Sequence, residues 1–271
     1  MKYEVFDDYI LVKDNENFNI KHVLECGQVF RYKVQDFGYT VYSLGQKADI
    51  YCQKDKVKIF TKSKKYFIKY FDLDTDYGII KLMLKKQLPS ETEFGYGIHI
   101  LNQAPLETMI SFIISANNNI PRIRKTIERI CERFGDKCDG YYAFPTLQQL
   151  GKITTQDFAE MGCGYRSQYL VDTIAKLQNY DLDRLYNLST ADARKELMSF
   201  KGIGRKVADC ILLFAFHKGD VFPADVWIVK AYEDEFGKTN MTPIKISEFY
   251  SKRFGDLSGI AQQYMYYAKR K

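Results

Sequence analysis

The feature that most constrains the fold is a pair of glycines between two apolar segments in the C-terminal third of the chain. Gly202 and Gly204 follow the mostly apolar stretch Leu197–Phe200, and the apolar run Ile211–Phe216 comes soon after them. Glycine adopts a positive φ at little cost, so the two glycines predict a tight turn. The pattern therefore predicts two helices joined by a glycine turn, a helix-hairpin-helix.

The start of the second helix has a chemical consequence. Its first backbone N–H groups have no partner within the helix, and such groups at a glycine turn bind a phosphate. The spacing of Gly202 and Gly204 is not that of a Walker A loop, which would also follow a strand rather than a helix. Backbone amides on a phosphate hold DNA without reading its sequence. We therefore expect Gly202 and Gly204 to contact a nucleic-acid backbone.

A lysine and an aspartate stand close to this turn. Lys206 lies in the first turn of the predicted helix, and Asp225 follows it by nineteen positions, after a Pro-containing turn. Chosen at random, such residues are a surface lysine and a helix cap. Here we expect burial and the charges of Lys201 and Arg205 to lower the pKa of Lys206, while a helix dipole keeps Asp225 ionised. A neutral lysine can attack a sugar C1′ and form a Schiff base, and the carboxylate can stabilise the positive charge.

Composition limits the class of protein. Hydrophobic residues make up 46% of the 271, which supports a sizeable core, and 40 Lys and Arg against 34 Asp and Glu give a net charge of +6. This mild excess is compatible with a polyanion partner. The six cysteines form no Cys-x-x-Cys pair or zinc-type cluster, which predicts reduced thiols, a cytoplasmic location and no required metal. No apolar run is long enough to cross a bilayer, so no membrane partner is expected.

The chain changes character near residue 65. Short aromatic and β-branched segments before it predict an antiparallel sheet, because no helix-length crossover separates them. The expected strands are Tyr9–Val12, Val29–Tyr32, Tyr39–Tyr42, Asp49–Cys52 and Val57–Phe60, with a hairpin connection at Lys54–Asp55. Amphipathic helices are expected afterwards, at Ile79–Leu84, Glu107–Ile114, Ile120–Phe134, Phe144–Leu150, Ser167–Leu177, Ala191–Ser199, Val207–Phe216, 226–236, 243–254 and Gly259–Lys269.

The predicted class is therefore α+β, with an N-terminal antiparallel sheet domain packed on two mostly helical subdomains. The expected limits are 1–90 for the sheet domain, 91–195 for the first helical subdomain, and 196–271 for the helix-hairpin-helix and the C-terminal helices.

The sequence also resembles a known family. Lys201–Cys210 followed by Phe222–Val226 is similar to the helix-hairpin-helix, Gly/Pro-rich loop and aspartate signature of base-excision DNA glycosylases (the HhH-GPD superfamily). Further stretches resemble the 8-oxoguanine DNA glycosylase branch: Glu25–Tyr32, Phe112–Ile120 and Gly162–Arg166. The resemblance covers nearly the whole chain. No cysteine follows Cys210, which excludes the four-cysteine iron–sulfur cluster of related branches. Trp227 stands where eukaryotic members carry a phosphate-binding histidine. In this respect the sequence resembles the bacterial and archaeal versions more closely.

The resemblance implies a role for particular residues. Lys206 would be the Schiff-base nucleophile, Asp225 the catalytic carboxylate, and the Gly27 carbonyl the acceptor for N7–H of 8-oxoguanine, a hydrogen that guanine lacks. The other implied contacts are Cys210 and Tyr266 around the flipped base, Gln262 on its Watson–Crick edge, Asn117 and Tyr165 in the space left in the duplex, and Arg122 and Arg166 on the orphaned cytosine.

Each of these residues also has an ordinary structural explanation. Cys210 and Tyr266 are typical of a core, Arg122 and Arg166 of surface charges, and the asparagines 117–119 of capping and turn chemistry. Pro121 restricts the backbone before Arg122, which bears on how that side chain is presented.

The resemblance implies a bifunctional glycosylase and AP lyase that excises 8-oxoguanine from double-stranded DNA, opposite cytosine, and cleaves the strand by β-elimination. We expect a monomer that requires no cofactor. The resemblance also allows a monovalent cation on the carbonyls of Met198, Phe200 and Ile203. Two alternatives remain: an alkylated-purine glycosylase of the same superfamily, which would use the aspartate without a lysine, and a non-catalytic helix-hairpin-helix DNA-binding protein.

Overall fold

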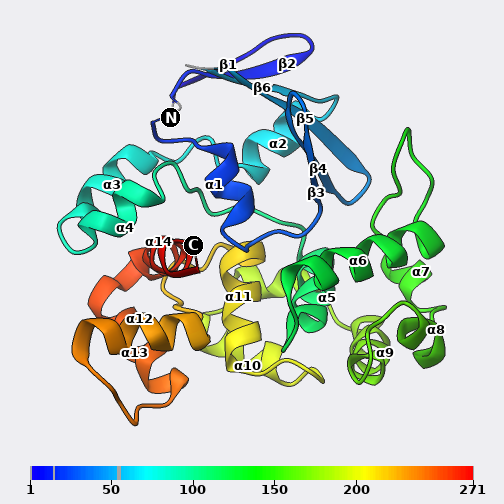
Figure 1. The fold of residues 1–271 in the computed structure, drawn as a ribbon. Coiled ribbons are helices and arrows are strands. Elements are labelled where there is room, and N and C mark those ends of the chain that lie inside the picture. Colours follow the sequence, from blue (N-terminus) through cyan, green and yellow to red (C-terminus); the bar gives the residue numbers. More distant parts are fainter. Residues whose placement is uncertain (1, 15, 54–55, 271) are drawn as a thin grey trace.

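The computed structural model describes residues 2–14, 16–53 and 56–270 and confirms the α+β class. A six-stranded antiparallel sheet lies at one end of the molecule, and helices make up the rest (Figure 1). The strand order is β1-β2-β6-β5-β4-β3. The strands are β1 Tyr3–Val5, β2 Tyr9–Val12, β3 Tyr32–Gln35, β4 Gly38–Ser43, β5 Gln46–Gln53 and β6 Lys56–Phe60.

The register of the sheet follows from its buried face. Ile10 of β2 pairs with Ile59 of β6, which pairs with Ile50 of β5, and all three side chains are fully buried. Successive side chains of a strand point to opposite faces of the sheet, so a shift by one residue would expose this row of isoleucines. Burial of one face therefore fixes the register of the three strands. Phe67 and Phe71 belong to the same buried cluster and cover that face.

One expectation for the N-terminal region is wrong, and strand β1 and one helix were not expected. The segment expected as a strand from Val29 to Tyr32 enters the sheet only at Tyr32, because Arg31 turns inward to an ion pair with Glu128 at 3.0 Å. A helix that was not expected, α1 (Ile20–Glu25), precedes it, capped by the Asn19 side chain. Its six residues are too few for a clear helical period. The expected connection at Lys54–Asp55 lies outside the described residues.

The helical part agrees more closely with expectation. The helices α6, α12 and α13 have the expected limits, and most others differ at the ends by one or two residues; the short helices α2, α4 and α8 were not expected. The helices after α1 are α2 Lys64–Tyr70, α3 Tyr77–Lys85, α4 Pro89–Phe94, α5 Pro105–Ser115, α6 Ile120–Phe134, α7 Leu147–Leu150, α8 Thr155–Glu160, α9 Arg166–Leu177, α10 Thr190–Met198, α11 Arg205–Phe216, α12 Val226–Phe236, α13 Pro243–Phe254 and α14 Ser258–Arg270.

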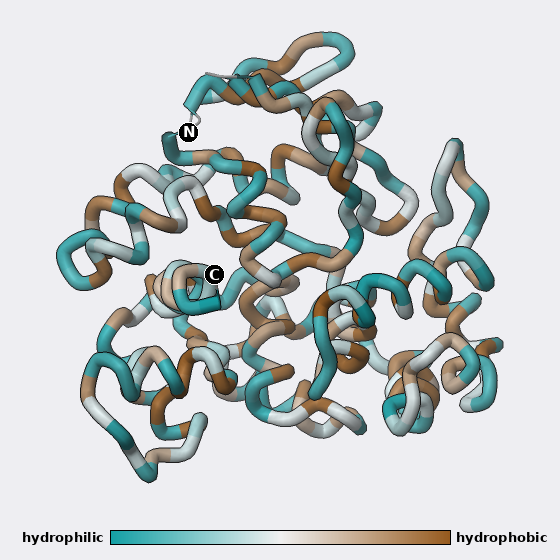
Figure 2. Tube along the Cα trace, in the orientation of Figure 1, coloured by the Kyte–Doolittle hydropathy of each residue, from teal (hydrophilic) through white to brown (hydrophobic). Residues whose placement is uncertain are grey.

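Helix α11 lies at the centre of the molecule (Figure 1). Every residue from Val207 to Phe216 is buried, and α11 packs against α5 and α10. Figure 2 shows mostly brown, hydrophobic stretches along α11 and more teal on outer helices such as α6. A helix buried on all sides is a rigid support for whatever stands at its ends. Within the described ranges, none of the helices combines the length and the apolar character that crossing a bilayer requires.

The division of the chain at residues 90 and 195 stays a prediction.

Candidate active site

The two glycines of the turn between α10 and α11 have different surroundings. Gly202 has a φ of +79°, and a Cβ there would lie 2.9 Å from the Tyr169 side chain. Gly204 caps α11 with a φ of −87°, and a Cβ there would meet nothing within 4 Å. The fold therefore requires glycine at 202 but not at 204. No side chain caps the N-terminus of α11, so its first amides stay available to an anion.

A buried carboxylate fixes the direction of α11. Asp209 is 1% exposed and accepts from Arg194 of α10 at 2.5 Å and from Arg205 at 3.3 Å. Burial raises the pKa of Asp209, although both arginines act in the opposite direction. This role was not predicted from the sequence, although the Arg205–Asp209 spacing of four residues was a usable signal. Asp209 ties together the two helices that flank the glycine turn.

The carbonyls expected to hold a monovalent cation lie on this turn. The Phe200 carbonyl accepts from the amide of Ile203 at 3.3 Å, while the Lys176 ammonium donates to the Ser199 carbonyl at 3.1 Å. The lysine also lies 4.2 Å from the centroid of the Phe200 ring. A side-chain cation therefore already donates a hydrogen bond to one carbonyl of the turn, although Ser199 is not one of the three expected donors.

Lys206 lies half-buried in the first turn of α11, with its ammonium 5.7 Å from the centroid of the Phe112 ring of α5. Burial lowers its pKa, but Cys210, Asp225 and Tyr266 together raise it further, so the pKa of Lys206 lies above its ordinary value. The expected lowering is therefore wrong. The groups that control this amine come from α12 and α14 as well as α11, and Lys201 and Arg205 do not dominate.

Asp225 stands at the N-terminus of α12. Its side chain accepts from the amide of Trp227 at 3.0 Å and of Ile228 at 3.2 Å, which confirms its expected place as a helix cap. The same carboxylate acts electrostatically on Lys206 and Cys210. The amine and the carboxylate, which stand nineteen positions apart in the chain, therefore act on each other electrostatically.

Gly27 follows α1 and has a φ of +86°. A Cβ there would lie 3.0 Å from the Tyr266 ring of α14 and 3.2 Å from the Arg270 guanidinium. Both the backbone angle and the close approach favour glycine. The structure therefore brings Gly27 next to the expected stacking ring of Tyr266, from opposite ends of the chain.

The segment that carries Gly27 is anchored by its neighbour. The Gln28 amide is fully buried and donates to the His99 carbonyl at 2.7 Å and the Val23 carbonyl at 2.9 Å. Its oxygen accepts from the Leu101 amide at 2.9 Å. A buried amide with these partners resists movement, because each lost hydrogen bond would leave a polar group unsatisfied. Gln28 is a second functional position that was not predicted from the sequence.

Three other expected pocket residues lie in the interior. Cys210 is 4% exposed, and burial raises the pKa of its thiol to about 11, so it is protonated at neutral pH. Gln262 is buried, and its oxygen accepts from the side chain of Gln263 at 2.7 Å. Tyr266 lies one helical turn after Gln262 on α14 and is half-buried. Cys210 and Tyr266 both act electrostatically on Lys206, which places them around the amine.

A second group of expected residues gathers between α5 and α9. Asn117 is exposed with a φ of +48°, an angle that asparagine tolerates better than most residues. Arg166 donates to the carbonyls of Ala116 at 2.7 Å, Asn117 at 2.8 Å and Cys163 at 3.2 Å. Tyr165 is 57% exposed, and the Arg166 guanidinium lies 4.4 Å from its ring centroid. In this structure Arg166 therefore supports the turn that presents Asn117.

Arg122 approaches the same region from α6. It is exposed, and its guanidinium lies 3.5 Å from the Gly162 carbonyl, just before Tyr165. Asn119 caps α6 by accepting from the Arg122 amide at 3.0 Å. Pro121 is compatible with this arrangement, because proline fits the first turn of a helix.

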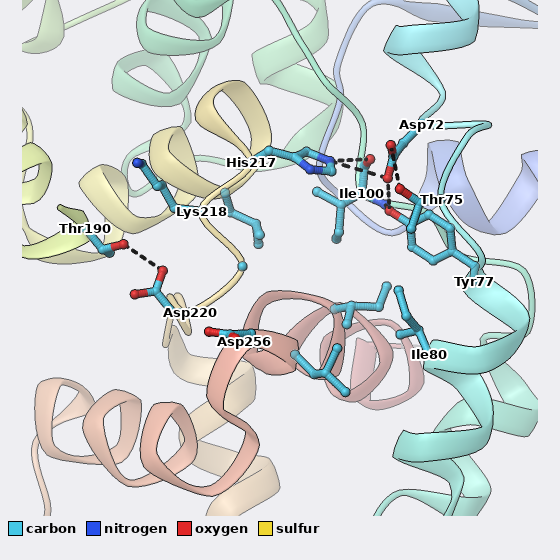
Figure 3. A pocket seen from close by; sticks show the side chains of 14 residues that line it. Asp72, Thr75, Tyr77, Ile80, Ile100, Thr190, His217, Lys218, Asp220 and Asp256 are labelled. Atoms are coloured by element: carbon cyan, nitrogen blue, oxygen red, sulfur yellow. Dashed lines mark hydrogen bonds and ion pairs between the residues drawn. The ribbon is translucent and has the colours of Figure 1, made fainter. Parts of the chain in front are cut away.

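The pocket in Figure 3 is separate from both groups. It has a volume of about 500 Å³ and surrounds the C-terminal end of α11, where Figure 3 shows His217 directed toward Asp72 and Ile100. Neither Lys206 nor Asp225 lines it. Within the part of the chain that the structure describes, no group of three or more His, Cys, Asp or Glu residues could hold a metal ion.

Comparison with known proteins agrees with this geometry. Residues 10–109 match the 8-oxoguanine DNA glycosylase N-terminal domain, and residues 110–256 match the HhH-GPD superfamily of base excision DNA repair proteins. The second match covers more than half of the chain. The chain therefore belongs to the HhH-GPD superfamily of base excision DNA repair proteins.

Within that superfamily, the chain is similar over its whole length to 8-oxoguanine glycosylase/lyases. The Clostridium acetobutylicum 8-oxoguanine glycosylase/lyase, solved with double-stranded DNA containing cytosine opposite 8-oxoguanine, has 38% identity and a TM-score of 0.95. All of this chain and 98% of that chain are covered. These matches confirm the family resemblance inferred from the motifs.

Curated relatives extend the agreement to other organisms. The Saccharomyces cerevisiae N-glycosylase/DNA lyase is 36% identical over 64% of this chain and 51% of that protein. A probable N-glycosylase/DNA lyase from Methanothermobacter thermautotrophicus is 29% identical over 72% of this chain and 70% of that protein. The chain thus spans about half the length of the first of these relatives.

Proposed function

We propose that this protein is a bifunctional DNA repair enzyme that excises 8-oxoguanine from double-stranded DNA and cleaves the strand at the abasic site. The observation that carries the proposal is that Lys206 interacts electrostatically with Asp225 and Tyr266, while the Tyr266 ring lies against Gly27. Each alone has an ordinary structural explanation. Together they supply a nucleophile, a carboxylate and an acceptor that distinguishes the lesion.

The first step is extrusion of the damaged nucleotide from the duplex, which costs a few kcal/mol. The amides at Gly202 and Gly204 bind a phosphate of the damaged strand. Asn117 and Tyr165 fill the vacated space, and Arg122 reaches the orphaned cytosine. Arg166 holds the Asn117 turn and uses its remaining N–H toward the same base. The contacts that fill the vacated space and those made to the orphaned cytosine offset the free-energy cost of extrusion.

The base then enters between Cys210 and Tyr266, with Gln262 at its Watson–Crick edge. The Gly27 carbonyl accepts from N7–H of 8-oxoguanine, whereas guanine would place an acceptor against an acceptor. A buried polar group left without a partner costs about 1–3 kcal/mol, so one carbonyl discriminates strongly.

Lys206 and Asp225 carry out the chemistry. The C1′–N9 bond breaks with its electron pair on the base, and the Asp225 carboxylate stabilises the positive charge that develops at C1′. Because its pKa is raised, Lys206 must lose a proton, which passes to the departing base, before its nitrogen bonds to C1′. Transfer of a proton from that nitrogen to O4′ then opens the sugar ring and gives the protonated Schiff base. Loss of a C2′ proton then expels the 3′-phosphate.

We propose double-stranded DNA as the partner of a monomeric enzyme, with no cofactor in the reaction. A monovalent cation on the carbonyls of Met198, Phe200 and Ile203 would strengthen phosphate binding at the turn. Lys176 supports that turn without one.

A panel of duplexes tests the function. Single-turnover excision is measured on 8-oxoguanine opposite each of the four bases, on an alkylated-purine duplex and on undamaged DNA. We expect rapid excision of 8-oxoguanine opposite cytosine and none of guanine. Excision of the alkylated purine alone would favour the first alternative, and binding without cleavage of any duplex would favour a non-catalytic DNA-binding protein.

A further inference from the structure

The last turn of α14 contacts the segment that carries Gly27. Arg270 donates from Nη2 to the Glu25 carbonyl at 2.7 Å and from Nη1 to the Tyr266 hydroxyl at 3.4 Å. Its guanidinium carbon lies 5.4 Å from the Tyr266 ring centroid. One side chain therefore holds the backbone before Gly27 and the ring expected to stack on the flipped base.

The Arg270 guanidinium also lies close to Gly27 itself. A Cβ at Gly27 would lie 3.2 Å from Nη1 of Arg270, so the two groups are neighbours. Gln28 anchors the same segment on its other side, through the His99 carbonyl and the Leu101 amide. The segment is thus fixed by Gln28 to the stretch from His99 to Leu101 and by Arg270 to α14.

We infer that Arg270 is a positioning residue that sets the spacing between the Gly27 carbonyl and the Tyr266 ring, and so determines selectivity for 8-oxoguanine. The inference rests on the function proposed above. Hydrogen bonds weaken steeply as their geometry departs from the optimum, so a single discriminating carbonyl must be held firmly. A planar guanidinium can hold two acceptors at a fixed separation, which the single ammonium of lysine cannot do.

Arg270→Ala provides the test, with Lys269→Ala as the matched control. Lys269 precedes Arg270 on the same helix, but its ammonium pairs with Asp234 of α12 rather than with the Gly27 segment. Each variant is assayed for single-turnover excision of 8-oxoguanine and for strand cleavage at a preformed abasic site. The second reaction uses Lys206 but needs no base in the pocket.

We expect Arg270→Ala to slow 8-oxoguanine excision about tenfold or more while cleavage at the abasic site is retained. Lys269→Ala should leave both rates unchanged, and Arg270→Lys should restore excision only in part. Thermal unfolding identifies variants that fail to fold, and Arg270→Met, which keeps the side-chain stem, replaces alanine in that case.

Equal losses in both reactions would overturn the inference, because they would indicate a general effect on structure or DNA binding. Unchanged excision of 8-oxoguanine by Arg270→Ala would overturn this inference but leave the proposed function standing. If the wild-type protein excised no 8-oxoguanine, the proposed function and this inference would fail together.

Discussion

The two halves of the active site are built in different ways. The glycine turn and Lys206 come from one continuous stretch at the start of α11, and the fold places Asp225 beside them from the next helix. The recognition half joins Gly27, in the first tenth of the chain, to Tyr266 and Arg270 at its other end. The difference teaches that the residues proposed for the chemistry lie within one short part of the chain, whereas those proposed for selectivity meet only through contacts between distant segments.

Asp225→Asn should produce the largest loss of activity. Removing the carboxylate leaves the charge at C1′ without its stabilising partner, and we expect excision to slow about 100- to 1000-fold. Asparagine caps a helix as well as aspartate does, so thermal stability should be nearly unchanged. Single-turnover kinetics and thermal unfolding check the two expectations. A variant with wild-type rates would remove Asp225 from the mechanism.

Gly27→Ala tests the recognition half. The added Cβ would lie 3.0 Å from the Tyr266 ring, and the alanine would have to adopt an unfavourable φ of +86°. We expect excision of 8-oxoguanine to fall about 10- to 100-fold because the single discriminating hydrogen bond is displaced. Cleavage at a preformed abasic site should persist, and a parallel loss in both assays would show that the two halves are not separable.

The pH dependence tests the amine. Because the pKa of Lys206 is raised, the amine is almost entirely protonated at neutral pH. Below that pKa, the free-amine fraction grows about tenfold per pH unit, so cleavage at an abasic site should accelerate from pH 6 to pH 8. Asp225→Asn removes one cause of the raised pKa and should shift the profile toward lower pH. A rate that does not change with pH would contradict this account.

The hairpin glycines give the smallest expected effects. Gly202→Ala should destabilise the fold by about 1–3 kcal/mol, because of its positive φ and its contact with Tyr169. Gly204→Ala should fold normally, yet bind DNA several-fold more weakly, because its Cβ projects where the phosphate approaches. Chemical denaturation and DNA binding at two salt concentrations separate the two. Equal losses of stability and of DNA affinity in the two variants would disprove the distinction between a structural Gly202 and a phosphate-binding Gly204.

The sequence predicted the parts of the site that are close together in the chain. The glycine turn, Lys206 and Asp225 were identifiable because glycine spacing, a helix cap and residue type carry their meaning locally. Most of the strands also followed from short aromatic and β-branched segments bounded by turn residues. The family resemblance added the distant residues, including Gly27, Gln262 and Tyr266.

Other parts depend on tertiary contacts that no local pattern contains. The pKa of Lys206 was predicted in the wrong direction because Cys210, Asp225 and Tyr266 outweigh burial, and two of these three residues come from α12 and α14. Helix α1 is too short for a clear period, and Arg31 leaves the expected strand to meet carboxylates on distant helices. Arg270 and Gln28 showed no local signal for their roles, since their partners lie far away in the sequence.

The central claim is that Lys206 forms a Schiff base with the sugar of a lesion selected by Gly27. Borohydride trapping on a duplex with 8-oxoguanine opposite cytosine tests it most directly, followed by mass mapping of the modified peptide. The account predicts a covalent adduct on Lys206 with the damaged duplex, none with undamaged DNA and none with Lys206→Gln. An undiminished adduct in that variant, or no adduct with the wild-type protein, would contradict it.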